Sequence, residues 1–274
     1  MTKNSHQKYL HHLQTSCPLV LCLTNTVTVT DCANALLAIG AAPVMSEDPS
    51  DAAALAGIAS SLVVNIGTVN NISQAVMESA VSVAKAKGLP IVLDPVGAGA
   101  SARRLEAAAT FLKSATIVRG NASEIMALAG QAGVQRGVDS SVKGDEELVT
   151  TKAQQLAAET KTIVAVSGKT DLITDGTTTV KLEGGTPLLT RITGTGCMLS
   201  VIVGAYAGCW PEDQFRAAAA AHLHMARASE NAQEGLKRPL ALGSFKVNLF
   251  DELALLEGSD LDRPKGIGHW KMDA

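Results

Sequence analysis

Three consecutive segments decide the fold: Ser61-Leu-Val-Val-Asn65, then Ser73 to Lys87, then Pro90-Ile-Val-Leu-Asp94. The first and last are short apolar runs, which is typical of buried strands. The middle segment places alanine and valine on one side and Glu78 and Lys85 elsewhere, which predicts an amphipathic helix. A strand, a helix and a second strand at this spacing predict a parallel pair joined by a crossover helix.

The same alternation extends toward both ends of the chain. Further strands are expected at Pro18–Thr24, Ala42–Met45, Ala115–Val118 and Thr162–Val166. The Asp175-Gly176 pair between two apolar runs predicts a β-hairpin. We expect one domain over residues 1–274, with an α/β fold: a doubly wound, mostly parallel sheet with helices on both faces.

The remaining segments fill in this plan. Leu188 to Ile192 is expected to be a strand end, and Gly130 to Asp145 a surface loop. After the glycine at position 194 the chain is expected to form three helices, at Cys197–Gly208, Pro211–Gln233 and Pro239–Leu256. The tail, Glu257–Ala274, is expected to be loosely held.

The composition limits the function classes. A formal net charge of -3 and an aromatic content of 3% disfavour a nucleic-acid partner, which needs a basic surface and stacking side chains. Five cysteines, an odd number without Cys-x-x-Cys spacing, predict reduced thiols. The polar N-terminus and the lack of a long apolar run predict a cytoplasmic protein without a membrane partner.

In such sheets ligands bind beyond the carboxyl ends of the strands. The candidate site residues are therefore the ones that follow the strands: Asn25, Met45, Gly67, Asp94, Arg119, Ser167 and Gly194.

The strongest of these positions is Thr193-Gly194-Thr195-Gly196-Cys197, hereafter the glycine turn. Because it opens an apolar helix, its backbone N–H groups and the helix dipole predict an anion hole at Gly194, Thr195, Gly196 and Cys197. We expect the helix start to lower the pKa of the Cys197 thiol. The alternative is a tight turn with an inert buried cysteine.

Two acidic residues suggest a metal. Asp94 ends an apolar strand, where a carboxylate needs a partner, and Mg²⁺ is one that carboxylates suit. Glu124 can supply a second carboxylate. The alternatives are a turn cap for Asp94 and, for Glu124, a capping box with Asn121.

Arg119 and Ser167 also follow strands. A guanidinium there can clamp phosphate oxygens, and a hydroxyl can donate to a phosphate or ribose. A surface ion pair is the alternative for Arg119. The chain has neither the Gly-x-x-x-x-Gly-Lys-Ser/Thr spacing of a P-loop nor a Gly-x-Gly-x-x-Gly after its first strand.

An anion hole, carboxylates for Mg²⁺ and a clamping arginine together indicate phosphoryl transfer, which needs positioning and charge neutralisation. Cys197 is the candidate base, as a thiolate at the helix start. His222 and His224 are alternative bases, although packing within an alanine-rich helix explains them better.

These residues resemble the ribokinase-like fold and, within it, the hydroxyethylthiazole kinases. The resemblance covers nearly the whole chain and rests on five motifs: Asn25-Thr-Val-Thr, Ala42-Pro-Val-Met45-Ser, Asp94-Pro-Val-Gly-Ala, Arg119-Gly-Asn-Ala-Ser-Glu124 and the glycine turn.

The resemblance implies transfer of the γ-phosphate of ATP to the hydroxyethyl group of 4-methyl-5-(2-hydroxyethyl)thiazole. It implies a homotrimer with sites near subunit boundaries, to which Asn25 and Met45 can contribute from a neighbour. The implied roles are ATP binding at Arg119, Ser167 and Asn121, thiazole binding at Met45, Gly194, Asn25 and Gly67, and Mg²⁺ binding at Asp94 and Glu124.

Three rival functions remain at this point. The nearest is a ribokinase-like kinase for hydroxymethylpyrimidine or a pyridoxal-type alcohol, for which an Asp in place of Cys197 is expected. The others are an ATP-dependent dehydratase for hydrated nicotinamide cofactors and a non-catalytic nucleotide-binding protein.

Overall fold

The computed structural model describes residues 7–130, 146–261 and 271–273. The predicted loop at 130–145 lies almost wholly outside this part of the chain, so it stays a prediction, as does a single domain over 1–274. Within the described residues the strands are β1 (Leu19–Leu23), β2 (Ala42–Val44), β3 (Ser61–Asn65), β4 (Ile91–Asp94), β5 (Ile117–Asn121), β6 (Ile163–Ser167), β7 (Thr170–Thr174), β8 (Thr179–Glu183) and β9 (Lys271–Asp273).

These strands form one sheet in the order β2-β1-β3-β4-β5-β6-β7-β8-β9. The six strands from β2 to β6 pair in parallel, and β7, β8 and β9 continue the sheet in antiparallel pairs. Chain order reverses at β1, which has β2 on one side and β3 on the other. The predicted doubly wound, mostly parallel sheet is confirmed, and the β1/β3 boundary is its topological switch point.

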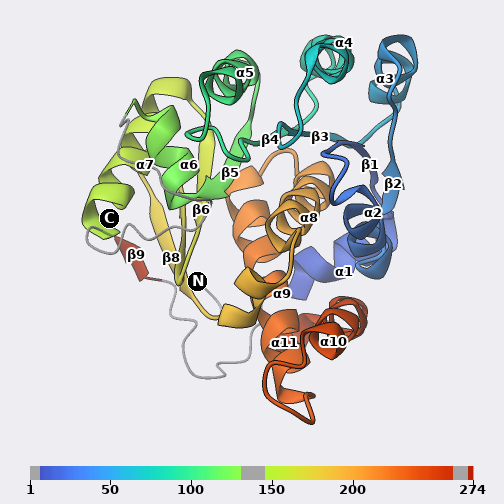
Figure 1. Ribbon diagram of the computed structural model, residues 1–274, viewed down its shortest axis with the longest axis vertical. Helices are drawn as coiled ribbons and strands as arrows, with labels where there is room; N and C mark the ends of the chain where they lie inside the picture. The colour runs from blue at the N-terminus through green and yellow to red at the C-terminus, as the bar shows by residue number, and fades with distance from the viewer. Residues whose placement is uncertain (1–6, 131–145, 262–270, 274) are drawn as a thin grey trace.

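Helices cover both faces, as predicted. One face carries α1 (Gln7–Ser16), α2 (Val29–Ala38), α8 (Thr195–Cys209), α9 (Gln214–Glu234), α10 (Leu242–Leu255) and α11 (Gly258–Leu261). The other face carries α3 (Pro49–Ala56), α4 (Asn71–Ala86), α5 (Ala102–Leu112), α6 (Ala122–Leu128) and α7 (Glu146–Thr160). Figure 1 shows α3, α4 and α5 along the top of the view and α8 to α11 below them.

The central strands are buried on both faces, so successive side chains enter opposite cores. Leu62 and Val64 of β3 join the core under α3 to α7, whereas Val63 joins the core under α8. This explains why β3 reads as a continuous apolar run, without polar alternation. The crossover helix α4 begins where Asn70 accepts hydrogen bonds from Ile72 N at 2.8 Å and Ser73 N at 3.0 Å.

The predicted strand end at Leu188–Ile192 is wrong. A 3-10 helix, η1 (Pro187–Arg191), occupies this segment. The Thr186 hydroxyl accepts a hydrogen bond from Leu188 N at 3.2 Å, and Pro187 stands at the first helical position. A capping threonine followed by proline favours a helical start, and this outweighed the apolar character of the segment.

Several predicted helix boundaries also shift. α9 begins at Gln214, three residues after Pro211, because Asp213 is its N-cap. α10 begins at Leu242, after Leu240, whose φ of 61° is incompatible with a right-handed helix. The tail is not wholly loose, since α11 lies against α1 and β9 pairs with β8. Among the described residues no helix is long and apolar enough to cross a membrane.

The helix α8 is buried nearly all round and crosses the sheet closely at Gly204. A Cβ added there would lie 2.5 Å from Val63 Cγ2 and 3.4 Å from Val20 Cγ1. The Ser61 hydroxyl also donates to Gly204 O at 2.7 Å. The absence of a side chain at Gly204 therefore sets the distance between α8 and the sheet, and with it the position of the glycine turn at the start of α8.

We expect Gly204→Ala to lower the free energy of unfolding by about 1–3 kcal/mol, because a methyl group overpacks against a stiff, buried valine. Gly243→Ala in α10 is the matched control, since a Cβ there meets nothing within 4 Å. That variant should gain up to about 1 kcal/mol from helix propensity. Urea denaturation measures both, and equal effects would contradict the close crossing.

Candidate active site

The candidate site lies where the carboxyl ends of the parallel strands meet the first turn of α8. Asn25 follows β1, Asn65 and Asp94 end β3 and β4, and Cys197 lies in the first turn of α8. All four side chains are buried. They form one hydrogen-bonded cluster at the switch point, where ligands of doubly wound sheets bind.

The glycine turn has the backbone geometry that an anion site needs. Gly194 is the N-cap of α8 with a φ of 93°, a left-handed conformation that favours glycine. A Cβ at Gly194 would also lie 2.8 Å from Thr28 Cγ2. Gly194 provides no side-chain cap for the first N–H groups of α8. These groups therefore suit an anionic ligand, in line with the predicted anion hole.

The neighbouring members of the predicted anion hole differ in role. The Thr195 hydroxyl donates to Leu189 O at 2.8 Å, which ties the turn to η1. A Cβ on Gly196 would lie 3.0 Å from Arg119 Nη1. Glycine at position 196 thus allows the Arg119 guanidinium to lie against the turn.

Cys197 is held by two amides. Asn25 Nδ2 and Asn65 Nδ2 each donate to its Sγ at 3.2 Å, and its side chain is 9% exposed. Burial and the nearby charge of Asp94 raise the pKa of this thiol, and the hydrogen bonds oppose the shift. The predicted lowering of the pKa is therefore wrong, because burial of the thiol and the charge of Asp94 outweigh the hydrogen bonds that favour the thiolate.

Asp94 is fully buried at the end of β4. Its Oδ2 accepts hydrogen bonds from Asn65 Nδ2 and Ser200 Oγ, both at 2.7 Å. Its Oδ1 is buried and has no hydrogen-bond partner within the described residues. Burial raises the pKa of this carboxyl, and the Arg119 guanidinium opposes the shift. A buried oxygen without a partner fits a hard cation, which prefers oxygen ligands.

The Glu124 carboxylate takes part in the N-terminal capping of α6. Its Oε1 accepts from Gly97 N at 2.9 Å and its Oε2 from Asn121 N at 2.8 Å. Asn121 Oδ1 in turn accepts from Glu124 N at 2.9 Å, so the capping box considered from the sequence is present. Burial first, and the charge of Asp94 second, raise the pKa of Glu124. Among the described residues no three His, Cys, Asp or Glu side chains gather as a metal cluster.

Arg119 connects the glycine turn with the end of β6. Its Nη2 donates to Ser167 Oγ at 2.5 Å, and its side chain is buried. Its Nε is buried and without a hydrogen-bond partner within the described part of the chain. The surface ion pair considered from the sequence is not what the structure has. A buried guanidinium with an unused donor beside an anion-binding turn is suited to phosphate oxygens.

Gly67 follows β3 and lies beside Asn25 and Asn65, since an added Cβ would be 3.2 Å from Asn25 Cβ. Gly67 N donates to Asn65 Oδ1 at 2.9 Å, and Gly67 O accepts from Arg104 Nη2 at 2.8 Å. Met45 follows the edge strand β2 and packs, half-buried, on the core beneath α8. Val27, in the loop between β1 and α2, is 67% exposed.

The sequence reasoning missed Asn65 and Ser200. Asn65 closes an apolar run with a polar side chain, which is the same signal that singles out Asp94. Ser200 lies one helical turn after Cys197, so i, i+3 spacing could have placed it on the same face.

The alternative bases do not reach the cluster. The His224 ring is buried between Tyr206 Oη, 2.9 Å from Nδ1, and Leu253 O, 3.0 Å from Nε2. Burial lowers the pKa of His224 to about 4. His222 bonds to Asp171 instead. The packing interpretation of His224 is confirmed.

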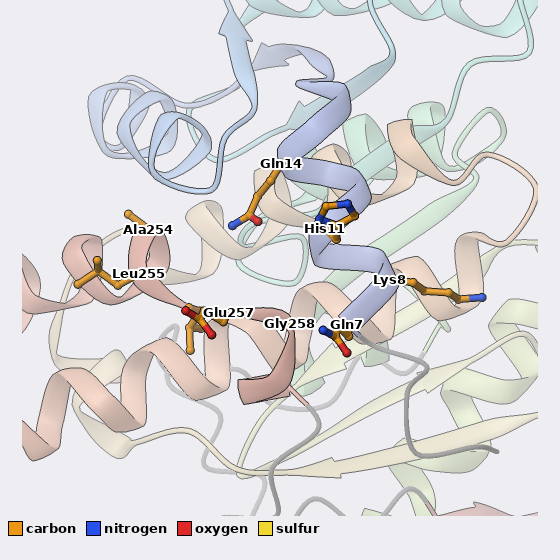
Figure 2. A pocket seen from close by; sticks show the side chains of 9 residues that line it. Gln7, Lys8, His11, Gln14, Ala254, Leu255, Glu257 and Gly258 are labelled. Carbon is orange, nitrogen blue, oxygen red and sulfur yellow. The ribbon is translucent and has the colours of Figure 1, made fainter.

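One cavity on the described surface lies away from this cluster. It measures about 640 Å³ and lies between α1 and the α10–α11 connection, where Figure 2 shows Gln14, His11 and Glu257 at its edge. It contains none of the predicted site residues. The second cavity, about 520 Å³, adjoins the glycine turn at Thr193 and is also lined by Val27.

Residues 10–258 match the family model described as "Hydroxyethylthiazole kinase family". The chain belongs to this family. A relative named hydroxyethylthiazole kinase from Tolumonas auensis is 45% identical over 251 residues, which cover 91% of this chain and 92% of that one. One from Pyrococcus furiosus is 43% identical over 91% of this chain and 92% of that one.

Solved structures agree with this assignment. The hydroxyethylthiazole kinase protein of Pyrococcus horikoshii superposes with a TM-score of 0.87 at 33% identity, over 98% of this chain and 99% of that chain. A ribokinase-like superfamily protein of Enterococcus faecalis gives a TM-score of 0.63 at 11% identity, over 93% and 95% of the two chains. The second likeness concerns the fold alone, and it confirms the predicted ribokinase-like architecture.

In this member of the hydroxyethylthiazole kinase family, the surroundings of Cys197 disfavour the thiolate form of its side chain. Burial and the charge of Asp94 raise the pKa of Cys197, which favours the neutral thiol. We expect Cys197 to react with iodoacetamide more slowly at pH 7 than the exposed Cys17, and its rate to rise as the pH approaches the raised pKa.

Mass spectrometry of tryptic peptides measures the two rates in one sample. The urea-unfolded protein is the control, in which both cysteines should react alike. Preferential alkylation of Cys197 in the folded protein at pH 7 would contradict the raised pKa.

Proposed function

We propose that this protein transfers the γ-phosphate of ATP to the hydroxyl of 4-methyl-5-(2-hydroxyethyl)thiazole, giving the thiazole phosphate and ADP in thiamine biosynthesis or salvage. The family membership supports the reaction and the acceptor. The observation that carries the proposal is that the buried Arg119 guanidinium lies against the glycine turn, which ends in Cys197; this arrangement suits an anion beside a group that can accept a proton.

The proposed route of the proton follows from this geometry. As the substrate hydroxyl attacks phosphorus, its proton must leave, and Cys197 Sγ is the acceptor placed at the helix start. Phosphoryl transfer through a loose transition state demands little of a base until late in the reaction. Cys197 can accept this proton only as the thiolate, so its own proton must first pass to solvent, and a cation at Asp94 would favour that loss by offsetting the charge that raises the pKa.

We assign the Mg²⁺ site to Asp94, whose Oδ1 is buried and without a hydrogen-bond partner among the described residues. Glu124 can join through its remaining lone pairs, since each of its oxygens accepts one backbone N–H. The ion would neutralise phosphate charge. A cation at Asp94 would also offset one of the two causes that raise the pKa of Cys197.

ATP contacts are assigned to Arg119, Ser167 and Asn121, the last of which caps α6 and is the register partner of Ser167. Thiazole contacts are assigned to Met45, Gly194, Asn25 and Gly67. The exposed Val27 and the position of Met45 at the sheet edge suit a site completed by a neighbour in a homotrimer. Light scattering that gives three chains per particle would support this assembly, and a monomer would contradict it.

The direct test is ADP release from Mg-ATP with the thiazole alcohol, run beside hydroxymethylpyrimidine, pyridoxal and no acceptor. Turnover that needs both the thiazole and Mg²⁺ is the expected result. If only another alcohol supports ADP release, the thiazole assignment fails while phosphoryl transfer stands. ATP binding without turnover on any acceptor would reject the kinase proposal itself.

The role of Cys197 predicts a difference between two substitutions. Cys197→Asp should keep kcat/KM within about tenfold of the wild type, because a carboxylate can accept the proton and both amide hydrogen bonds. Cys197→Ala should lower kcat by about 10²-fold or more, the usual contribution of a general base. Steady-state ADP release measures both. An aspartate enzyme as inactive as the alanine enzyme would argue against proton acceptance at this position.

A further inference from the structure

The helix α9 contains a buried polar contact outside the cluster around Cys197. His222 is 1% exposed, and its Nδ1 lies 2.7 Å from Asp171 Oδ2 on β7. Asp171 is partly exposed, with 19% of its side chain accessible. The contact joins a helix on one face of the sheet to the strand that follows the Ser167 turn.

The second oxygen of Asp171 holds that turn. Asp171 Oδ1 accepts a hydrogen bond from Gly168 N at 2.9 Å. Gly168 and Lys169 form the tight connection from β6 to β7, and both are exposed. The preceding Ser167 receives the Arg119 guanidinium. Hydrogen bonds thus run from His222 through Asp171 to the backbone beside Ser167.

The two histidines of α9 differ in a way that bears on their roles. His224 has a partner for each ring nitrogen, which is what a packing residue requires. His222 Nε2 is buried without a hydrogen-bond partner in the described residues. If Asp171 is a carboxylate, His222 Nδ1 carries the proton and donates it in this hydrogen bond. His222 Nε2 then has lost its hydrogen bonds to water without gaining a partner, which costs free energy. The bond to Asp171 is the one polar contact that offsets this cost within the described residues.

We propose that Asp171 and His222 are positioning residues that hold the Ser167–Lys169 turn in the conformation that binds the nucleotide. This inference rests on the proposed assignment of Ser167 and Arg119 to ATP. The occupant is a nucleoside triphosphate or diphosphate, whose phosphate or ribose oxygens would meet the Ser167 hydroxyl and the Arg119 guanidinium.

We expect the Asp171–His222 pair to affect nucleotide binding and not the chemical step, because Asp171 contacts the Ser167–Lys169 turn and neither residue contacts the reacting atoms. Without Asp171, Gly168 N loses its acceptor, and an exposed two-residue connection can adopt other conformations. The fraction of protein ready to bind nucleotide then falls, and the apparent KM rises by the inverse of that fraction. At saturating ATP the turn is again in place, so kcat and the KM for the thiazole should change little.

The test compares His222→Leu with His222→Asn. Leucine fills the space but cannot donate to Asp171, whereas the asparagine amide can replace the Nδ1–H donor. We expect His222→Leu to raise the KM for ATP about tenfold, the effect of losing one charge-assisted hydrogen bond. His222→Asn should restore it to within about threefold. Titration calorimetry with ADP should show the same ratios without turnover.

His224→Leu is the matched control on the same helix, since its partners are Tyr206 and Leu253 O. It should lower the Tm while leaving the KM for ATP unchanged. If His222→Leu fails to fold, Asp171→Ala on the partly exposed strand carries the test alone, with the same expected rise in KM for ATP.

Ser167→Ala separates this inference from the function on which it rests. Unchanged ADP affinity in Ser167→Ala would reject the assignment of this turn to the nucleotide, and with it the role of the pair. Weakened affinity in Ser167→Ala together with wild-type affinity in folded His222→Leu or Asp171→Ala would overturn only the positioning role. A parallel rise of the KM values for both substrates would also overturn it.

Discussion

The site depends on the burial of one carboxylate, Asp94, which ends β4 beside the switch point of the sheet. A buried charge needs partners, and here the Asn65 amide donates to Asp94 Oδ2 at 2.7 Å and to Cys197 Sγ at 3.2 Å. The same amide therefore fixes the distance between the carboxylate and the thiol. Ser200 completes the partners of Oδ2, which leaves Oδ1 as the oxygen available to a ligand.

The doubly wound topology explains why these groups meet. Asn65 and Asp94 are register partners at the ends of β3 and β4, so adjacent strands present them side by side. The helix α8 approaches the sheet closely at Gly204, which brings Cys197 over the same strand ends. Arg119 and Ser167 are two residues apart in the register of β5 and β6, and they extend the polar surface away from the switch point. The residues proposed for charge neutralisation and for proton acceptance thus lie along the carboxyl edge of one sheet.

Much of this was predictable, because apolar runs, strand ends and the glycine turn are local signals. Asn25, Asp94, Arg119 and Cys197 were found by their place in that pattern. The pKa of Cys197 could not be predicted, because it depends on burial and on Asp94, which is distant in sequence. The sequence left Glu124 open between two roles, and only the structure shows that both its oxygens accept backbone N–H groups. The strand expected at Leu188–Ile192 failed because Thr186 and Pro187 begin a 3-10 helix.

A crystal structure with Mg²⁺, a non-hydrolysable ATP analogue and the thiazole alcohol would test the central claim most directly. The expected complex has the terminal phosphate at the start of α8, between Arg119 and the glycine turn, with the metal at Asp94 Oδ1 and the hydroxyl facing Cys197 Sγ. A nucleotide bound in the cavity between α1 and the α10–α11 connection, with the strand ends left to solvent, would contradict it.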